Sequence, residues 1–206
     1  LTIGVVTKPF KFEGRKRQKN AIEGIEELIS KVDSLVTIPN DRLLEIASKE
    51  MTMKEAFEYA DDVLRQGVQG IADTITKNAM INLDFADVRS TMQNTGTALM
   101  GVGVGKGEDR AIAAAKAAIS SPLLETSIQG ATALLINISG QNPTLMETQE
   151  AVDYINDATG GEPDVIFGVI DDPGAKDDIR VTVIATGFAR VSAEEQMYQA
   201  SQPKAE

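Results

Sequence analysis

Two aspartates three positions apart, Asp84 and Asp87, are the side chains in this sequence best placed for acid–base chemistry, and they follow Asn82 in the segment 82–88. If a helix begins near Asp84, Asp87 lies one turn further along the same face, so both carboxylates can point at one water molecule or cation. The alternative is structural: one aspartate caps the helix, and the other complements the helix dipole in its first turn. Spacing alone favours the capping interpretation.

A second segment with possible chemistry is the glycine-rich stretch 101–107, because glycines before a helix expose backbone N–H groups to a phosphate. Its spacing matches neither G-x-G-x-x-G nor G-x-x-x-x-G-K-[ST]. The sequence therefore favours a strand-to-helix turn with close packing, in which the glycines admit a neighbouring side chain.

Composition narrows the chemistry further. The 206 residues include no cysteine and no histidine, which excludes disulfides, thiolate chemistry, His-based triads and zinc sites of the usual ligand types. The net charge of −11 argues against a nucleic-acid binder, and the short basic cluster at 15–19 is typical of a solvated helix face. No apolar run is long enough to cross a bilayer, and no basic region precedes an apolar stretch, so we expect no direct membrane insertion and no secretion signal.

Alternating strand and helix patterns predict an α/β fold. Strands are expected at 2–6, 35–39, 98–104, 132–139, 165–171 and 179–186, and helices at 14–32, 42–48, 52–75, from 84 onward, at 108–120 and at 144–158. Asn40 and Asp41 are expected to cap the helix at 42–48. The last two strands, joined across the turn 171–178, are expected to form an antiparallel hairpin.

The longest expected helix, 52–75, opens with a capping box formed by Thr52 and Glu55. An apolar stripe continues along it, and Gly67 and Gly70 lie inside it. Because glycine destabilises a helix interior by about 1 kcal/mol, these two are expected to let another backbone or helix approach closely. The helix ends just before Asn82 and is expected to be a strut that joins two domains.

Six stretches, taken together and in order, resemble the FtsZ family of tubulin-like GTPases. They lie at 4–10, 12–17, 38–44, 82–88, 121–128 and 181–188. The resemblance implies the end of a Rossmann-like GTPase domain at 1–50, a central helix at 51–77, a C-terminal α/β domain with a mixed four-stranded sheet at 78–190, and the start of a linker at 191–206. The family's Gly-Gly-Gly-Thr-Gly-Thr-Gly phosphate loop has no counterpart, so the chain resembles the C-terminal part of the family's globular core.

The same resemblance implies a nucleotide site for GTP or GDP. Glu13 and Arg17 would contact the ribose and phosphate side, Asn40 and Asp61 the guanine base, and Phe57 would stack on the base. A carboxylate can accept two N–H bonds from guanine, and an aromatic face stacks on any purine. For Phe57 the alternative is core packing, since it lies on the apolar stripe of the long helix.

The resemblance places Asn82, Asp84 and Asp87 in the family's synergy loop, which enters the nucleotide site of the next subunit in a filament. There the acids would orient the water that attacks the γ-phosphate, with Mg²⁺ bound in the intact protein and no further metal site.

The intact protein is thus expected to be a cytoplasmic, mid-cell division GTPase that polymerises head to tail into the division ring and works with other division proteins. This chain alone is expected to be inactive. The alternative is a non-enzymatic assembly or capping module that acts through its longitudinal polymer interface. An unrelated α/β ligand-binding protein would require the ordered motifs to be accidental.

Family inhibitors bind in a cleft between the central helix and the C-terminal sheet. Here it would be lined by Gln66, Gly70, Asp73, Met100, Asn137 and Thr182. For each of these residues ordinary interdomain packing is the alternative.

Overall fold

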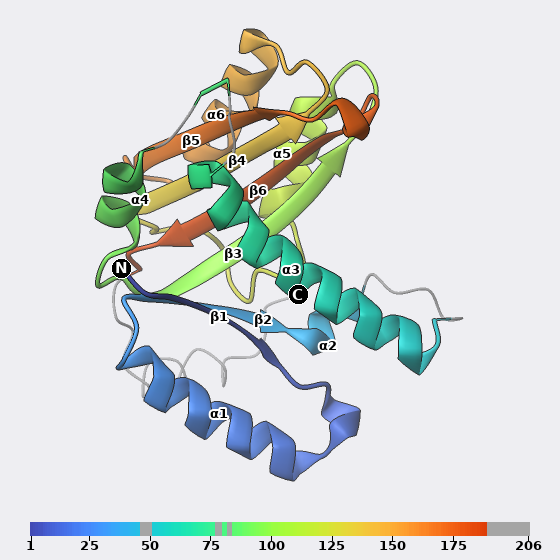
Figure 1. The fold of residues 1–206 in the computed structure, drawn as a ribbon, viewed down its shortest axis with the longest axis vertical. Coiled ribbons are helices and arrows are strands. Elements are labelled where there is room, and N and C mark those ends of the chain that lie inside the picture. Colours follow the sequence, from blue (N-terminus) through green and yellow to red (C-terminus); the bar gives the residue numbers. More distant parts are fainter. Residues whose placement is uncertain (46–50, 77–79, 82–83, 189–206) are drawn as a thin grey trace, which may run out of the picture.

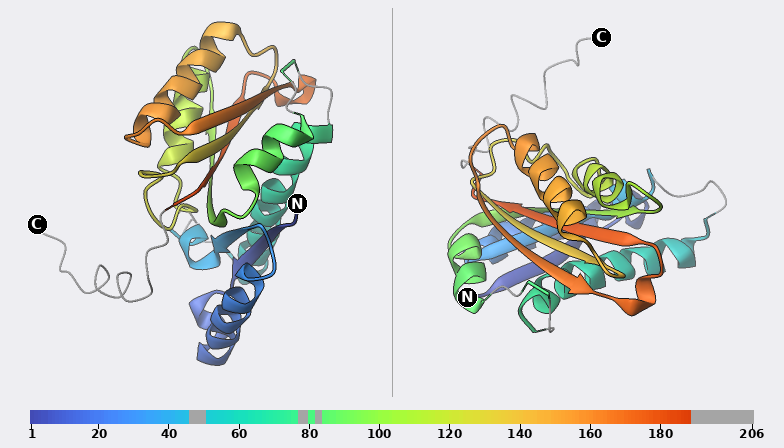
Figure 2. Two further views of the ribbon diagram at one scale, coloured as in Figure 1. Left: turned by 90° about the vertical axis from the view of Figure 1, so that its left-hand side faces the viewer. Right: turned by 90° about the horizontal axis from the view of Figure 1, so that it is seen from above.

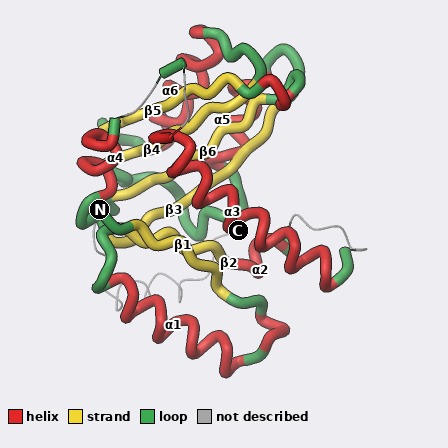
Figure 3. Tube along the Cα trace, viewed as in Figure 1, coloured by secondary structure: helices red, strands yellow, loops and turns green. Residues whose placement is uncertain are grey.

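A mixed sheet with helices on both faces forms the frame of the molecule (Figure 1; Figure 2). The computed structural model describes residues 1–45, 51–76, 80–81 and 84–188. The strands are β1 (Ile3–Lys8), β2 (Ser34–Pro39), β3 (Gly96–Gly105), β4 (Ala133–Gly140), β5 (Asp164–Asp171) and β6 (Ile179–Thr186). The helices are α1 (Arg15–Ile29), α2 (Asn40–Leu43), α3 (Met53–Thr76), α4 (Phe85–Met92), α5 (Arg110–Ile119) and α6 (Leu145–Ala158), with short 3₁₀ turns η1 (Lys11–Glu13) and η2 (Pro173–Ala175) (Figure 3). The predicted α/β class is confirmed.

The six strands lie in the order β1-β2-β3-β6-β4-β5, and β3 joins the two halves of the sheet. Residues 96–98 of β3 pair in parallel with residues 34–36 of β2, whereas residues 99–105 pair antiparallel with β6. The predicted mixed four-stranded sheet is present as β3, β6, β4 and β5, and it is continuous with β1 and β2.

The predicted hairpin between the last two strands is wrong. β6 pairs antiparallel with both β3 and β4, and β4 lies between β6 and β5. The connection passes over the end of β4 at Gly140, where a Cβ would lie only 2.8 Å from the backbone oxygen of Asp178. Most of β6 is buried on both faces, which requires a central position that a terminal hairpin would not provide.

Two apolar cores cover the two faces of the sheet. On one face α5 and α6 pack against Leu134, Ile136 and Ile138 of β4, together with alternate residues of β6. On the other face α3 and α4 pack against Leu135 and Ile184. Successive residues of a strand point to opposite faces, so β4 and β6 each contribute to both cores.

Three glycines of β3 bring the backbone of α5 onto the sheet. A Cβ at Gly101, Gly103 or Gly105 would lie 2.2, 2.1 or 1.9 Å from the backbone oxygens of Ala118, Ala114 and Arg110, respectively. The close packing predicted for this stretch is confirmed, but the partner is helix backbone rather than a side chain. Every second residue of a strand points to the same face, so all three glycines face α5, and each one meets a successive turn of that helix.

The glycines of α3 are approached by side chains, and not by a backbone or a helix as expected. A Cβ at Gly67 would lie 3.1 Å from the sulfur of Met100, and one at Gly70 would lie 3.2 Å from Cγ2 of Thr182. The Nδ2 of Asn137 donates to the backbone oxygen of Gly70 at 3.2 Å, which attaches α3 to β4.

Capping residues in the sequence predicted the start of α3 correctly, but not the start of α2. The backbone N of Thr52 donates to Glu55 at 2.7 Å and the backbone N of Glu55 donates to Thr52 Oγ1 at 3.2 Å, which confirms the capping box. In contrast, Asn40 and Asp41 lie inside α2, whose N-cap is Pro39. The helix expected at 42–48 ends earlier, because α2 stops at Leu43 and residues 44–45 form a turn. Residues 46–48, and the linker predicted at 191–206, fall outside the described residues.

An ion pair fixes one end of α5. Arg110 Nε donates to Glu147 Oε1 at 2.7 Å, and Arg110 Nη2 donates to the backbone oxygen of Gln141 at 3.1 Å. Glu147 also accepts from the backbone N of Thr144 at 2.8 Å, which closes a capping box at the start of α6. The Arg110 hydrogen bond lowers the pKa of Glu147 to about 2 from its usual 4.5.

We expect Gly103→Ala to lower the free energy of unfolding by about 2–4 kcal/mol, because its Cβ would enter the backbone of α5. The control is Gly24→Ala in α1, where a Cβ meets nothing within 4 Å. That change should raise stability by about 0.5–1 kcal/mol through helix propensity. Urea unfolding of both variants makes the comparison, and an unchanged midpoint for Gly103→Ala would contradict the packing described.

Glu147 should make stability depend on pH in a definite direction. Its folded-state pKa lies below its unfolded value, so its contribution is present above about pH 4.5 and is lost as pH falls towards 2. We expect wild type to exceed Glu147→Gln by about 2 kcal/mol at pH 6, with the gap closing across that range. A gap that stays constant from pH 6 to pH 2 would mean that the carboxylate charge is not the source.

Candidate functional site

Asp84 and Asp87 stand at the start of α4. Asp84 is its N-cap, and Asp84 Oδ1 accepts a hydrogen bond from the backbone N of Asp87 at 2.9 Å. The capping interpretation is therefore confirmed for Asp84. Both residues are exposed, and the cap engages one oxygen of one carboxylate, so capping leaves the acids accessible to a ligand. Asn82 lies outside the described residues, and the catalytic roles of all three remain predictions.

The helix that carries these acids is held firmly on its inner side. Val88 and Met92 are fully buried in the core beneath α4. Thr186 Oγ1 of β6 donates to the backbone oxygen of Thr91 at 3.0 Å in a buried position. The acids thus project from a helix whose opposite face is fixed to the sheet.

At the other end of α3, three phenylalanines form an aromatic cluster. The rings of Phe10 and Phe12 stack with centroids 4.8 Å apart, and Phe57 meets Phe10 edge-on at 5.5 Å and Phe12 at 6.1 Å. Phe10 is fully buried, whereas Phe57 is 39% exposed. Phe57 therefore packs against its neighbours and still presents surface to a ligand, so the two interpretations of Phe57 are compatible. The sequence analysis assigned no role to Phe10 or Phe12.

Asn40 begins α2, directly after β2. Asn40 is 6% exposed, and its Oδ1 has no hydrogen-bond partner among the described residues. The same is true of two other buried side-chain oxygens, Ser34 Oγ and Asn156 Oδ1. A buried amide oxygen without a partner is unfavourable by about 1–3 kcal/mol, which is relieved if a ligand N–H donates to it. A guanine base carries such donors.

Glu13 and Arg17 form an ion pair at the start of α1, with Arg17 Nη1 2.5 Å from Glu13 Oε2. Glu13 Oε1 also accepts from the backbone N of Phe10 at 2.9 Å, so this carboxylate holds the turn η1 in shape. The Arg17 side chain is 70% exposed and remains accessible. Asp61 is exposed on α3, one turn beyond Phe57.

Contacts between these elements bring the five predicted nucleotide contacts to one edge of the sheet. The strands β1 and β2 are parallel, so their carboxyl ends meet at the same edge. The backbone N of Lys11 in η1 donates to Asp41 Oδ1 in α2 at 2.9 Å, and the phenylalanines join η1 to α3. Glu13, Arg17, Asn40, Phe57 and Asp61 thus lie on adjoining elements.

The base-side residues and the acids are far apart. From Phe57 to the last residue of α3, Thr76, the helix rises roughly 28 Å at 1.5 Å per residue. Figure 1 shows α4, which Asp84 caps, on the opposite side of the molecule from the start of α3. The two groups of predicted site residues therefore do not adjoin each other within one chain.

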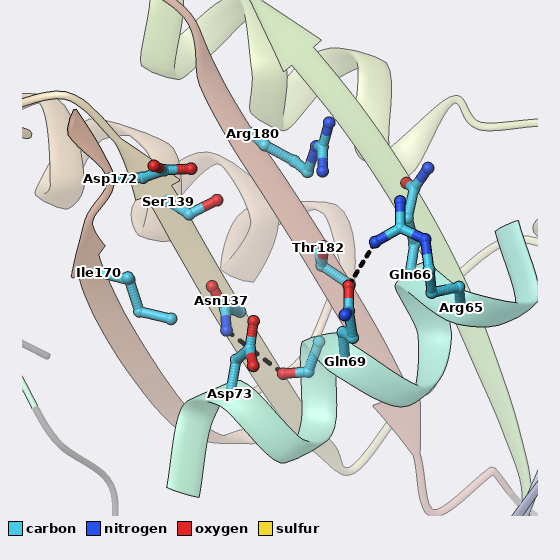
Figure 4. Close-up of a pocket in the computed structure, with 11 residues that line it drawn as sticks. Arg65, Gln66, Gln69, Asp73, Asn137, Ser139, Ile170, Asp172, Arg180 and Thr182 are labelled. Carbon is cyan, nitrogen blue, oxygen red and sulfur yellow. Dashed lines mark hydrogen bonds between the residues drawn. The ribbon is translucent and has the colours of Figure 1, made fainter. Parts of the chain in front are cut away.

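A polar hollow of about 230 Å³ lies between α3 and the sheet (Figure 4). Gln66, Gly70, Asp73, Asn137 and Thr182 line it as predicted. The prediction for Met100 is wrong, because this side chain is buried against Gly67. The hollow is also lined by residues that were not predicted from the sequence: Arg65, Gln69, Ser139, Ile170, Asp172 and Arg180.

The charged side chains at the rim of the hollow are partly engaged with each other. Arg65 pairs with Asp62 and donates to Gln69 Oε1 at 2.5 Å, while Gln66 donates to Asp62 Oδ2 at 2.5 Å. The Arg65 hydrogen bond is the main cause that lowers the pKa of Asp62.

The described part of the chain contains neither an acidic cluster for a metal ion nor a helix that could span a membrane. Within it, no three acidic side chains gather into a group that could hold a metal ion. No helix there has the length and apolar character to cross a membrane.

Comparison with known proteins identifies the family. Residues 1–48 match the model of the tubulin/FtsZ family GTPase domain, and residues 96–189 match that of the FtsZ family C-terminal domain. An FtsZ structure from M. jannaschii, an empty dimer, aligns with 91% of this chain at 42% identity and a TM-score of 0.87. The chain belongs to the FtsZ family. It spans about 55% of the length of that relative.

Two more distant structures share the fold. CetZ1 from Haloferax volcanii, a GDP-bound monomer, aligns with 97% of this chain at 17% identity and a TM-score of 0.73. CetZ2 from the same organism, a protofilament with bound GTPγS, aligns over the same share with a TM-score of 0.67. The chain spans 59% and 58% of these two relatives.

The capping role of Asp84 can be separated from its charge. We expect Asp84→Ala to lower the free energy of unfolding by about 1 kcal/mol, because the N-cap bond to Asp87 is lost. Asp84→Asn keeps a capping oxygen and should stay within a few tenths of a kcal/mol of wild type. Thermal unfolding of both variants tests this, and equal loss in both would show that the carboxylate charge, and not the cap, stabilises α4.

Proposed function

We propose that this chain provides two separate half-sites of a GTPase: a guanine-binding edge at one end of α3 and a pair of activating acids at the other. The observation that carries the proposal is the placement of the two groups at opposite ends of α3, which rises roughly 28 Å from Phe57 to Thr76. In this proposal a nucleotide held at Phe57 does not reach the acids of the same chain. In a head-to-tail assembly the acids of one subunit reach the nucleotide held by the next.

The guanine-binding edge has the chemistry that a purine requires. Phe57 offers an aromatic surface for stacking, and Asn40 Oδ1 is a buried acceptor that a base N–H satisfies. Asp61 accepts N–H donors of guanine, while Glu13 and Arg17 face the ribose and phosphate side. The Asp41–Lys11 bond and the phenylalanine contacts hold these elements in place.

The acids act by position and charge. Asp84 and Asp87, with Asn82, orient the water that attacks the γ-phosphate, and their carboxylates accept its hydrogen bonds as the bond to phosphorus forms. Mg²⁺ neutralises phosphate charge when it is bound, and Asp84 and Asp87 are the acidic side chains that would face it. The family phosphate-loop signature does not occur in the 206 residues, so this chain alone should bind GTP weakly and not hydrolyse it.

In this proposal the intact protein binds and hydrolyses GTP, polymerises into the division ring at mid-cell in the cytoplasm, and meets other division proteins there. Family membership and the likeness to FtsZ structures support it. The polar hollow beneath α3 is the place where inhibitors of the family are expected to bind.

The test is GTP turnover by this chain mixed with a separately produced nucleotide-binding domain from an FtsZ protein. We expect the mixture to hydrolyse GTP, and Asp84→Asn and Asp87→Asn to lower kcat about 100-fold or more by removing charge at the attacking water. Phe57→Ala should instead raise KM about 10-fold or more, because one stacking contact is worth about 1–3 kcal/mol.

The matched control is Asp153→Asn, which changes an exposed helix acid on α6. It should leave both kcat and KM unchanged. If the acid variants retain full turnover, or if the chain only blocks polymerisation of an intact homologue, the chain is the non-enzymatic capping module instead.

A further inference from the structure

Met80 and Ile81, which lie between α3 and α4 in the sequence, are bound to the outer edge of β5. The backbone N of Met80 donates to the oxygen of Val169 at 2.8 Å, and the backbone N of Val169 donates to the oxygen of Ile81 at 3.2 Å. Ile81 and Val169 form an antiparallel bridge. β5 is the last strand in the sheet order, so this bridge lies on an outer edge of the sheet. Asp84 follows Ile81 by three positions in the sequence.

Val169 uses both of its backbone groups in this bridge. In a parallel strand pair, the N–H and C=O of one residue point to the same side and those of the next residue point to the other. Val169 therefore faces outward, and the neighbouring residues Gly168 and Ile170 bond to β4. A change that removes the N–H of Val169 breaks the bridge and leaves the pairing with β4 intact.

The bridge and the core contacts of α4 hold the acids from both sides. Ile81 is fixed to β5, and Val88 is fully buried beneath α4. From Ile81 to Asp84 the chain spans at most about 10 Å, so a slip of one strand residue, about 3.3 Å, would displace the N-cap by a large part of that length. Orientation of an attacking water tolerates much smaller errors.

We infer that the Val169 bridge is the positioning element for Asp84 and Asp87: it sets where the chain enters α4 and hence where the two carboxylates lie. Val169 contacts no nucleotide in this scheme and acts only through the backbone of Met80 and Ile81. The expected effect of the bridge on turnover rests on the proposed function. The expected effect of the bridge on the position of Asp84 and Asp87 does not.

Two variants weaken the bridge from opposite sides. Val169→Pro removes the donor to Ile81, and proline is tolerated at outward positions of edge strands. Met80→Pro removes the shorter of the two bonds that the Val169 oxygen accepts, the other coming from the backbone N of Ile81 at 3.5 Å, and changes a side chain that is 64% exposed. Val165→Pro is the matched control, because residue 165 has the same outward orientation on β5 and no described residue bridges to it.

The first measurement is amide hydrogen exchange of the 206-residue chain. We expect Val169→Pro and Met80→Pro to accelerate exchange of the Asp87 and Val88 amides about 10-fold or more, with amides of α5 and α6 unchanged as a sign of an intact fold. Val165→Pro should leave all of these rates unchanged. Unchanged Asp87 and Val88 rates in both bridge variants would overturn the inference.

The second measurement is turnover in the two-component assay. Both bridge variants should lower kcat about 10-fold at unchanged KM, because the acids move while the base-binding edge does not. If the bridge variants keep full kcat while Asp87→Asn loses it, the positioning role is wrong and the proposed function stands. If exchange accelerates but Asp84→Asn and Asp87→Asn keep full turnover, the positioning of the loop stands and the proposed function fails.

Discussion

The fixed rise of an uninterrupted α-helix is the constraint on which this molecule depends. α3 runs for 24 residues without a break, and its length determines how far apart its two ends must lie. Each end adjoins a different group of polar side chains, with the aromatic and amide groups at one end and the acids just beyond the other. Because a packed helix cannot shorten, the proposed function requires two molecules to meet before the two groups can serve one nucleotide.

The sheet keeps this helix rigid. Gly67 and Gly70 let Met100 and Thr182 approach α3 closely, and Asn137 bonds to the backbone of Gly70. Behind those strands, the glycines of β3 bring α5 into direct contact with the sheet, so a helix supports each face. β3 itself pairs with strands of both halves, so the strands beside the phenylalanine cluster and the strands beneath α4 belong to one sheet.

Local features of this fold could be predicted, and features that depend on distant partners could not. Thr52 with Glu55, and Asp84 before α4, follow from side chains that bond to backbone a few residues away. The position of β6 between β3 and β4 could not be inferred, because adjacent strands in sequence suggest a hairpin and only the burial of both β6 faces argues otherwise. The contact of Gly101, Gly103 and Gly105 with helix backbone could not be predicted either. Glycines indicate that some group approaches closely, but not which group it is.

The candidate site likewise combines features that could be predicted from the sequence with features that could not. Family motifs supplied Glu13, Arg17, Asn40, Phe57 and Asp61, and the described contacts place their elements at one edge. The stacked pair Phe10 and Phe12 was not predicted, although both phenylalanines lie beside the motif that holds Glu13. Met100 was misplaced because a residue on the strand facing α3 can fill the space over a glycine as easily as line a hollow.

The most direct measurement is complementation between two variants of an FtsZ GTPase whose corresponding segment is replaced by these 206 residues. One variant carries Asp84→Asn and Asp87→Asn, and the other carries Phe57→Ala and Asp61→Ala. If the acids act on the nucleotide of a neighbour, each variant alone is inactive and an equal mixture recovers up to about a quarter of wild-type turnover, the share of head-to-tail contacts that unite two intact half-sites. No recovery in a mixture that still forms joint filaments would contradict a site shared between subunits.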